Sequence, residues 1–341
     1  MFKSPMNLIF WMIVLFCSRS VAQKDYYLTL STIKARPLSM GSAYTAMEDN
    51  IASAGFNPAT LCLYRFDKAH RITLFFNPIA PMGLFSERFG SDLDPSRAMN
   101  ERLKTALLLF KGIAMTANLL DVALILNEQV INMTALAEQR RFFEDCAIWE
   151  HGYHSLVARL KLADRVSIGI STSFYRNTIA DQPKNGWGFS YGILLKPSQK
   201  MNVGVSFVDF PNPIAEVRWP LERLSDQTMN IGIAYRPWPK AIFSLDVRNL
   251  TEDERKGVRE IHFGFEQNFF SIMAIRAGYF KERFTPVHTF SAGIGLIDSN
   301  MLFADENKFN HAQFLLNYAL LYQRGLGQIA RWHVLSVLVR I

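Results

Sequence analysis

Two pairs of residues in this 341-residue chain have the type and spacing that a catalytic site or a metal site could use. Glu48 and Asp49 are adjacent carboxylates and could serve as an acid and a base. His151 and His154 are three residues apart, which places them on opposite faces of a strand and argues against a shared metal ion. The sequence contains no Gly-x-Ser-x-Gly motif, Gly-rich phosphate loop or His-Glu-x-x-His motif. We therefore expect no enzyme, no metal site and no cofactor.

The two carboxylates lie in a segment of small residues that spans residues 35–61. Ala43, Ala46 and Met47 recur at helical spacing, and Pro58 would end a helix. Glu48 and Asp49 do not lie on the side of this predicted helix that carries the small residues. The pattern predicts a small helical plug, in which the carboxylates cap the helix or contact the surrounding wall.

The rest of the chain consists of short runs in which apolar and polar residues alternate, the pattern of half-buried strands. These runs span residues 70–78, 153–162, 165–176, 186–196, 201–209, 228–236, 241–249, 259–269, 273–281, 288–297, 311–322 and 332–341. Short turns between them alternate with longer loops, such as 177–185 and 210–225. This repeat is typical of an outer-membrane β-barrel, with short periplasmic turns and long external loops.

The region between residues 101 and 141 is ambiguous. Residues 102–126 form either a hairpin that turns near Lys111 and Gly112 or an amphipathic helix. Residues 129–145 are rich in Ala, Glu, Gln and Arg, which favours a helix there. If residues 102–126 contribute two strands, the barrel has about fourteen, an even number as expected.

The two faces of the predicted strands differ in a way that suits a membrane barrel. The apolar faces would contact lipid, while the polar faces combine Gly and Ser with isolated charges and would line a lumen. A soluble β-sandwich is the alternative fold. The lumen-facing charged or titratable candidates are Asp246, Arg248, Glu260, His262, Glu266 and Arg276. Aromatic residues near the ends of the runs would form the interfacial girdles, namely Tyr153, Trp187, Tyr191, Tyr235, Trp238, Tyr279, Tyr322 and Trp332.

The first residues resemble an export signal. Lys3 precedes the apolar stretch 8–16, which is too short to span a bilayer, and Ser20-Val21-Ala22 is a small-x-small cleavage site. We expect residues 1–22 to be cleaved, 23–66 to form the N-terminal segment and plug, and 67–341 to form the barrel. An N-terminal membrane anchor is the alternative.

Charge and cysteine content narrow the functional classes further. The formal charge is +7, but no run of Lys and Arg residues is long enough to suggest a nucleic-acid binding surface. Cys62 and Cys146 either pair in an oxidising compartment or remain separate thiols.

Two motifs near the N-terminus carry a resemblance to a known family. The first is Ala35-Arg36-x-x-x-Met40-Gly41-x-Ala43-x-x-Ala46-x-Glu48-Asp49, and the second is Asn57-Pro58-Ala59-x-Leu61. This pattern resembles that of FadL-like outer-membrane proteins, especially the PorV/PorQ-type branch. Ser42 and Thr60 stand where the family usually has Gly, and Ile341 stands where an aromatic residue is usual.

The resemblance implies a hatch inside a 14-stranded barrel of the bacterial outer membrane. It places the hatch or gate residues at Arg36, Gly41, Ala43, Ala46, Glu48, Asp49, Asn57 and Pro58. The implied partners are outer-membrane lipid and either a hydrophobic small molecule or a secreted protein. We expect passage of hydrophobic or amphipathic small molecules with the hatch as gate. The alternatives are a PorV-like component of type IX secretion that binds secreted proteins, and a purely structural barrel.

Overall fold

The computed structural model describes residues 26–29, 33–63, 70–77, 110–129, 151–179, 182–209, 227–248, 250, 260–269, 273–281, 288–296, 313–325 and 328–340. The chain is almost entirely β-structure. Its strands are β1 Tyr26–Thr29, β2 His70–Phe76, β3 Phe110–Ala117, β4 Leu120–Gln129, β5 His151–Ala163, β6 Val166–Ile179, β7 Gln182–Ser198, β8 Met201–Asp209, β9 Gln227–Tyr235, β10 Ala241–Arg248, β11 Glu260–Phe269, β12 Met273–Lys281, β13 His288–Leu296, β14 Gln313–Gly325 and β15 Gln328–Arg340. Two short helices, α2 Ala35–Ser39 and the 3-10 turn η1 Pro58–Thr60, complete the described elements.

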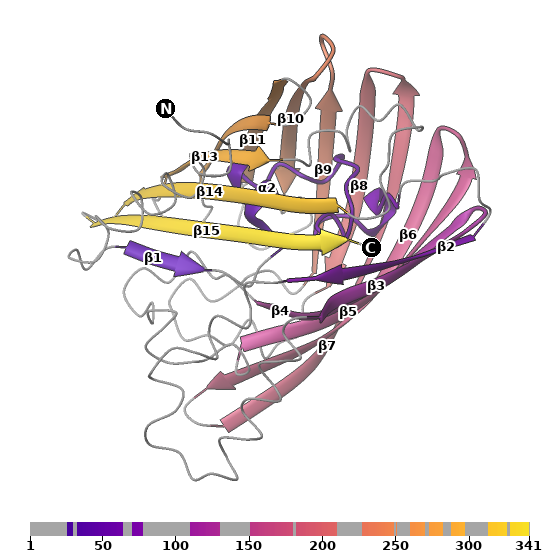
Figure 1. Cartoon of the computed structure of the whole chain (residues 1–341), viewed down its shortest axis with the longest axis horizontal. Coiled ribbons are helices and arrows are strands. Elements are labelled where there is room, and N and C mark those ends of the chain that lie inside the picture. The colour runs from indigo at the N-terminus through magenta and orange to yellow at the C-terminus, as the bar shows by residue number, and fades with distance from the viewer. Residues whose placement is uncertain are drawn as a thin grey trace, which may run out of the picture.

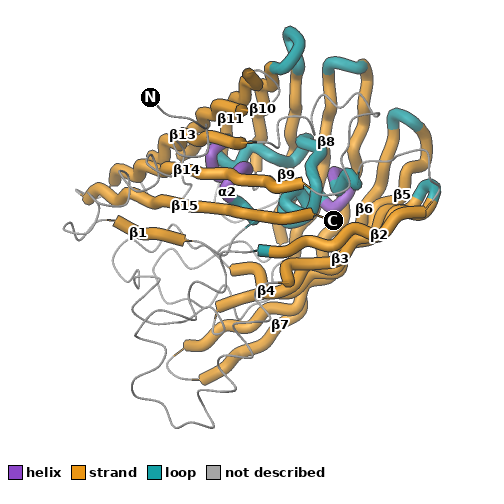
Figure 2. Tube along the Cα trace, in the orientation of Figure 1, coloured by secondary structure: helices purple, strands orange, loops and turns teal. Residues whose placement is uncertain are grey.

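Strands β2 to β15 form one closed antiparallel barrel, in which each strand pairs with its neighbours in the sequence. The barrel closes where β15 pairs with β2, so the prediction of fourteen strands around a lumen is confirmed. The tube in Figure 2 shows the wall of strands surrounding the loops and helices of the N-terminal segment. No helix in the described part of the chain is long and apolar enough to cross a bilayer.

The closure of the barrel is short. Only Val339–Phe76 and Arg340–Phe75 are paired between β15 and β2, because β2 has only seven residues and is offset along β15. Strand β1 lies parallel to β15 beside residues Arg331–Val334, next to this closure in Figure 1. The N-terminal strand therefore extends the sheet at the edge that β2 leaves uncovered.

Residues 110–126 lie in a hairpin, the first of the two alternatives, but the predicted turn was wrong. The chain turns at Asn118 and Leu119, where Asn118 adopts a positive φ of 46° that asparagine tolerates well. Lys111 and Gly112 instead lie within β3. A Cβ on Gly112 would lie 2.5 Å from the carbonyl oxygen of Leu124, so glycine here permits close strand pairing rather than a turn. The expected helix at 129–145 lies outside the described residues, apart from Gln129, which ends β4.

The expected long loop 177–185 is also wrong, because β6 and β7 remain paired up to Ile179 and Gln182. The alternation within these strands is confirmed: large apolar side chains such as Ile170 and Phe189 point outward and are exposed, while Ser171 and Gly192 face inward. One girdle residue was placed on the wrong face. Trp332 is buried inside, where its indole N–H donates to Gln323 Oε1 at 2.9 Å.

Residues 33–63, which we call the hatch, lie inside the barrel and are almost wholly buried. The helix predicted from the spacing of Ala43, Ala46 and Met47 is absent from the hatch, whose helical parts are α2 and η1. The chain leaves α2 through Gly41 and Ser42, whose φ values of 58° and 59° break helical geometry. The small residues therefore serve close packing against the wall instead of one face of a helix.

Candidate functional site

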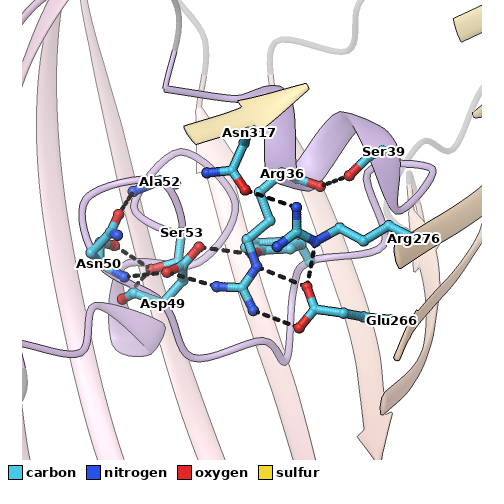
Figure 3. Close-up of polar contacts among 10 residues, drawn as sticks. Arg36, Ser39, Asp49, Asn50, Ala52, Ser53, Glu266, Arg276 and Asn317 are labelled. Carbon is cyan, nitrogen blue, oxygen red and sulfur yellow. Dashed lines mark hydrogen bonds and ion pairs between the residues drawn. The ribbon is translucent and has the colours of Figure 1, made fainter. Parts of the chain in front are cut away.

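The centre of the hatch is a buried cluster of four charged side chains (Figure 3). Arg36 on α2 donates from Nε to Glu266 Oε2 at 3.0 Å and from Nη2 to Glu266 Oε1 at 3.1 Å. Its Nη1 lies 3.1 Å from Asp49 Oδ1 within the hatch. Arg276 on β12 also donates to Glu266, and its Nη1 donates to Asn317 at 2.8 Å. Two cations and two carboxylates thus compensate one another in an interior that would otherwise disfavour each of them.

The Arg36 cluster anchors the hatch to the wall at one place, and Asp246 anchors it at a second. Asp246 projects from β10 and accepts three hydrogen bonds from the hatch. Its Oδ2 lies 2.8 Å from Tyr44 N, 3.0 Å from Thr45 N and 2.8 Å from Thr45 Oγ1. Arg248 on the same strand donates to the carbonyl of Ser42 and lies 3.2 Å from Asp246 Oδ2. These contacts fix the hatch backbone through groups that no helix or sheet satisfies.

The same segment is tied to Asp49 by Tyr44. The Tyr44 hydroxyl donates to Asp49 Oδ2 at 2.8 Å, and the pKa of this buried phenol is raised well above its usual value, chiefly by burial. Tyr44 therefore stays protonated as a donor. Because Asp49 also contacts Arg36, the Arg36 cluster and the Asp246 anchor form one continuous polar network.

Glu48 connects the hatch to the opposite part of the wall. Its Oε1 lies 2.7 Å from Arg159 Nη2 on β5, and its Oε2 lies 2.7 Å from Lys196 Nζ on β7. Burial raises the pKa of Glu48, but the two cations outweigh burial and leave it below its ordinary value. Arg159 also donates to the carbonyl of Leu61 at 2.6 Å, so it holds the hatch at two points.

A third buried pair, which sequence reasoning missed, holds the beginning of the hatch. Lys111 Nζ on β3 lies 2.9 Å from Glu128 Oε2 on β4, and both side chains are fully buried. The backbone N–H of Ile33 donates to the same carboxylate at 3.1 Å. The only signal in the sequence was a lysine within a largely apolar run, which local periodicity does not assign to either face.

The hatch backbone lies directly against a row of glycines on the inner wall. A Cβ on Gly278 would lie 2.0 Å from Gly41 N, one on Gly204 would lie 2.1 Å from Thr45 O, and one on Gly169 would lie 2.3 Å from Ala59 N. Comparable overlaps with the hatch occur at Gly192, Gly232, Gly264 and Gly293. The Gly and Ser content of the polar faces therefore provides the space in which the hatch fits.

Among the described residues, apolar contacts between the hatch and the wall form three clusters, the largest of which involves β2–β5, β14 and β15. Ile51, Ala54, Leu61 and Leu63 of the hatch pack in one buried cluster with wall residues of β2–β5, β14 and β15. The wall members are Phe75, Ala114, Ala123, Ile125, Val157, Leu315 and Leu338. Charges occur on some of the same strands, because Lys111 and Glu128 lie on β3 and β4 and Arg159 lies on β5. Ion pairs and apolar contacts therefore hold the hatch together around the wall.

The remaining sequence candidates have identifiable positions. Ala43 and Ala46 are fully buried in the hatch. Asn57 caps η1, which begins at Pro58, by accepting from Ala59 N at 3.0 Å, and it donates to Thr45 O at 2.8 Å. His262 Nδ1 lies 2.7 Å from the carbonyl of Gly41, and its Nε2 lies 3.4 Å from Glu260.

The residues first considered for chemistry do not form a reactive site in the described part of the chain. Glu48 and Asp49 face different partners, and His154 stacks on Phe174 with ring centroids 6.5 Å apart. Among the described residues, no group of three His, Cys, Asp or Glu side chains could hold a metal ion. The His151 side chain and Cys146 lie outside the described residues, as do residues 1–22.

Comparison with known proteins gives a distant match to porins. No family model and no curated protein matches the sequence. Among solved structures, variants of the Rhodopseudomonas blastica porin align over 67% of this chain and 75% of theirs, with TM-scores of 0.35 and 0.36 at 12% and 10% identity. These neighbours, like this chain, are β-barrels. The likeness to FadL-like proteins rests on sequence motifs alone, those of the hatch and the closing stretch from Asn317 to Ile341.

Proposed function

We propose that this chain spans a bacterial outer membrane as a barrel and passes hydrophobic or amphipathic small molecules, with the hatch as the gate. The carrying observation is the apolar cluster between the hatch and strands β2–β5, β14 and β15, which is larger than the other two hatch clusters in the described part of the chain. Porin lumens are polar, whereas a lumen lined partly by Phe75, Ile125 and Leu338 suits solutes with an apolar part.

The membrane location is supported by the outward faces of the strands. Ile72, Ile170, Phe189, Ile233 and Phe290 each expose more than a third of their surface, as do many other large apolar residues spread around the wall. So many exposed large apolar side chains would favour aggregation in water, whereas lipid would cover them. The closed barrel pairs the strand backbones internally, as a membrane requires.

The gate is proposed to open at this apolar cluster. Moving Ile51, Ala54 and Leu63 away from the wall exposes apolar surface that an amphipathic solute would cover again. Moving Arg36 away from Glu266 instead leaves buried charges without their partners, which costs about 3–5 kcal/mol for a broken pair. Moving Tyr44 and Thr45 away from Asp246 breaks three further hydrogen bonds to a buried carboxylate. The ion-paired part of the hatch would therefore stay in place while the apolar part yields.

Flux into liposomes tests this function. Wild type, Arg36→Gln and a deletion of residues 35–61 would be reconstituted with an entrapped sensor for a fluorescent fatty acid and, separately, for a hydrophilic dye. We expect wild type to admit the fatty acid but not the dye, Arg36→Gln to admit the fatty acid faster, and the deletion to admit both. Equal fatty-acid flux in all three proteins and in empty liposomes would contradict transport.

A second candidate is supported by the density of anchors. Ion pairs and glycine contacts from β3 to β13 would make the hatch a permanent plug, and such a barrel would serve as a surface platform that binds secreted proteins. In that case hatch variants leave solute flux unchanged. Deletion of the connection 210–226 would then abolish co-purification of the secreted partner.

A further inference from the structure

Three basic residues lie side by side on the outward face of the barrel. In the strand register Lys281 of β12 is opposite His288 of β13, and His288 is opposite Arg324 of β14. Lys281 and Arg324 are exposed and His288 is half-buried. We call Lys281, His288 and Arg324 the basic row.

An aromatic row lies one step along the same face. Tyr279 is opposite Phe290, and Phe290 is opposite Tyr322, which is opposite Arg331. The Tyr279 hydroxyl is hydrogen-bonded to His288 Nδ1 at 2.8 Å and so links the two rows. Aromatic residues of this kind mark the level of lipid headgroups on a membrane barrel.

The charge of this surface is one-sided. Below the basic row, the outward faces of β12 to β14 contain uncharged residues such as Ile275, Phe290 and Leu320, and β15 adds the basic residue Arg331. Within the described residues of these four strands, no aspartate or glutamate faces outward to neutralise it. The basic row, with the two cations Lys281 and Arg324, lies above an aromatic row and an apolar belt, an arrangement complementary to a lipid that has an anionic headgroup and acyl chains.

We infer that the basic row binds the phosphate groups of an anionic lipid in the outer leaflet. The inference rests on the proposed membrane location. The basic row lies at the barrel end that bears the connections 77–109, 130–150 and 210–226. In outer-membrane barrels the long connections lie on the external side of the membrane. Arg324 supplies a planar fork and Lys281 a point charge, the two usual cationic partners of phosphate.

Lipid binding to the full-length protein tests the site. Wild type, Lys281→Gln/Arg324→Gln and the matched control Arg165→Gln/Lys200→Gln would be placed in phosphatidylcholine nanodiscs. Arg165 and Lys200 are exposed basic residues in turns at the opposite end, so both doubles remove two charges. Each protein would be titrated with fluorescent diphosphoryl lipid A and with the same lipid lacking its phosphates.

We expect wild type and the control to prefer the phosphorylated lipid, with inorganic phosphate unable to compete. The Lys281→Gln/Arg324→Gln variant should bind the phosphorylated lipid about 25-fold more weakly than wild type, because each lost charge near an anionic surface weakens binding roughly fivefold. Equal weakening in both doubles, or no phosphate preference in wild type, would overturn this site while leaving membrane insertion intact. Failure of all three proteins to enter nanodiscs would overturn the proposed location and the site with it.

Discussion

Arg36 and Glu266 form a two-point ion pair across 230 residues of sequence, with Nε and Nη2 of the arginine 3.0 and 3.1 Å from the two carboxylate oxygens. Both side chains are almost fully buried. This pair joins the hatch to the inner wall at β11, and Arg276 and Asp49 complete the charge balance around it. The hatch is therefore attached to the wall by side chains as well as by the covalent chain.

Arg36→Gln should loosen the hatch. The substitution removes the cationic partner of Asp49 and one of the two arginines paired with Glu266, and breaking a buried pair costs about 3–5 kcal/mol. Urea unfolding in lipid, followed by limited proteolysis of residues 33–63, measures the loss. Arg165→Gln in an exposed turn is the control, and protection of the hatch equal to that control would contradict its anchoring role.

Gly278→Ala should displace the hatch without a change of charge. The added Cβ would lie 2.0 Å from Gly41 N, and overpacking of this kind costs about 1–3 kcal/mol. Ala277→Val on the outward face of the same strand adds bulk where Ala277 is exposed, and is the matched control. Hydrogen exchange at residues 33–63 should accelerate in Gly278→Ala alone, whereas identical exchange in both variants would show that the hatch does not rest on this wall.

The contribution of Glu48 should depend on pH. Its pKa is lowered in the folded protein, because Arg159 and Lys196 outweigh the effect of burial. Stabilisation by this carboxylate is therefore complete above its ordinary pKa of 4.5 and is lost as the pH falls through the lowered value. The urea midpoint of wild type should exceed that of Glu48→Gln near neutral pH, and the two should converge in acid. A difference that stays constant with pH would contradict these ion pairs.

The β15–β2 closure should be trapped by a cross-strand disulfide. Phe76 and Val339 are directly paired, so Phe76→Cys/Val339→Cys should oxidise readily when Cys62 and Cys146 are replaced by Ser. Leu316→Cys/Val337→Cys, between β14 and β15, is the positive control. Mass spectrometry of peptides under non-reducing conditions detects both bonds. A crosslink in the control alone would show that the barrel closes with another register.

The sequence alone predicted the barrel because its signal is local and repeated. In β6, Ile168 and Ile170 alternate with Ser171 and Ser173, and each strand contributes the same period of two. The predictions were wrong where one residue type can occupy two kinds of structural position. Gly112 was interpreted as a turn residue, although it permits close strand pairing, and Trp332 was assigned to a girdle although its indole is bonded inside.

The hatch was located from its small residues, but its contacts required the fold. The partners of Arg36, Tyr44 and Glu48 lie on β5, β7, β10 and β11, and no spacing in the sequence relates them. The helical spacing of Ala43 and Ala46 was misleading. Both residues lie in a non-helical part of the hatch, where their small side chains are buried in close packing. The pairing of β1 with β15 depends on backbone contacts and has no side-chain signature.

The conductance of single barrels in a planar bilayer tests most directly whether the hatch closes the lumen. The comparison is between wild type and Arg36→Gln/Glu48→Gln, which removes the two anchors at Glu266 and at Arg159 and Lys196. We predict that wild type inserts but conducts almost no ions, and that the double variant shows frequent openings. A steady, equally large conductance in both proteins would contradict a lumen closed by the hatch.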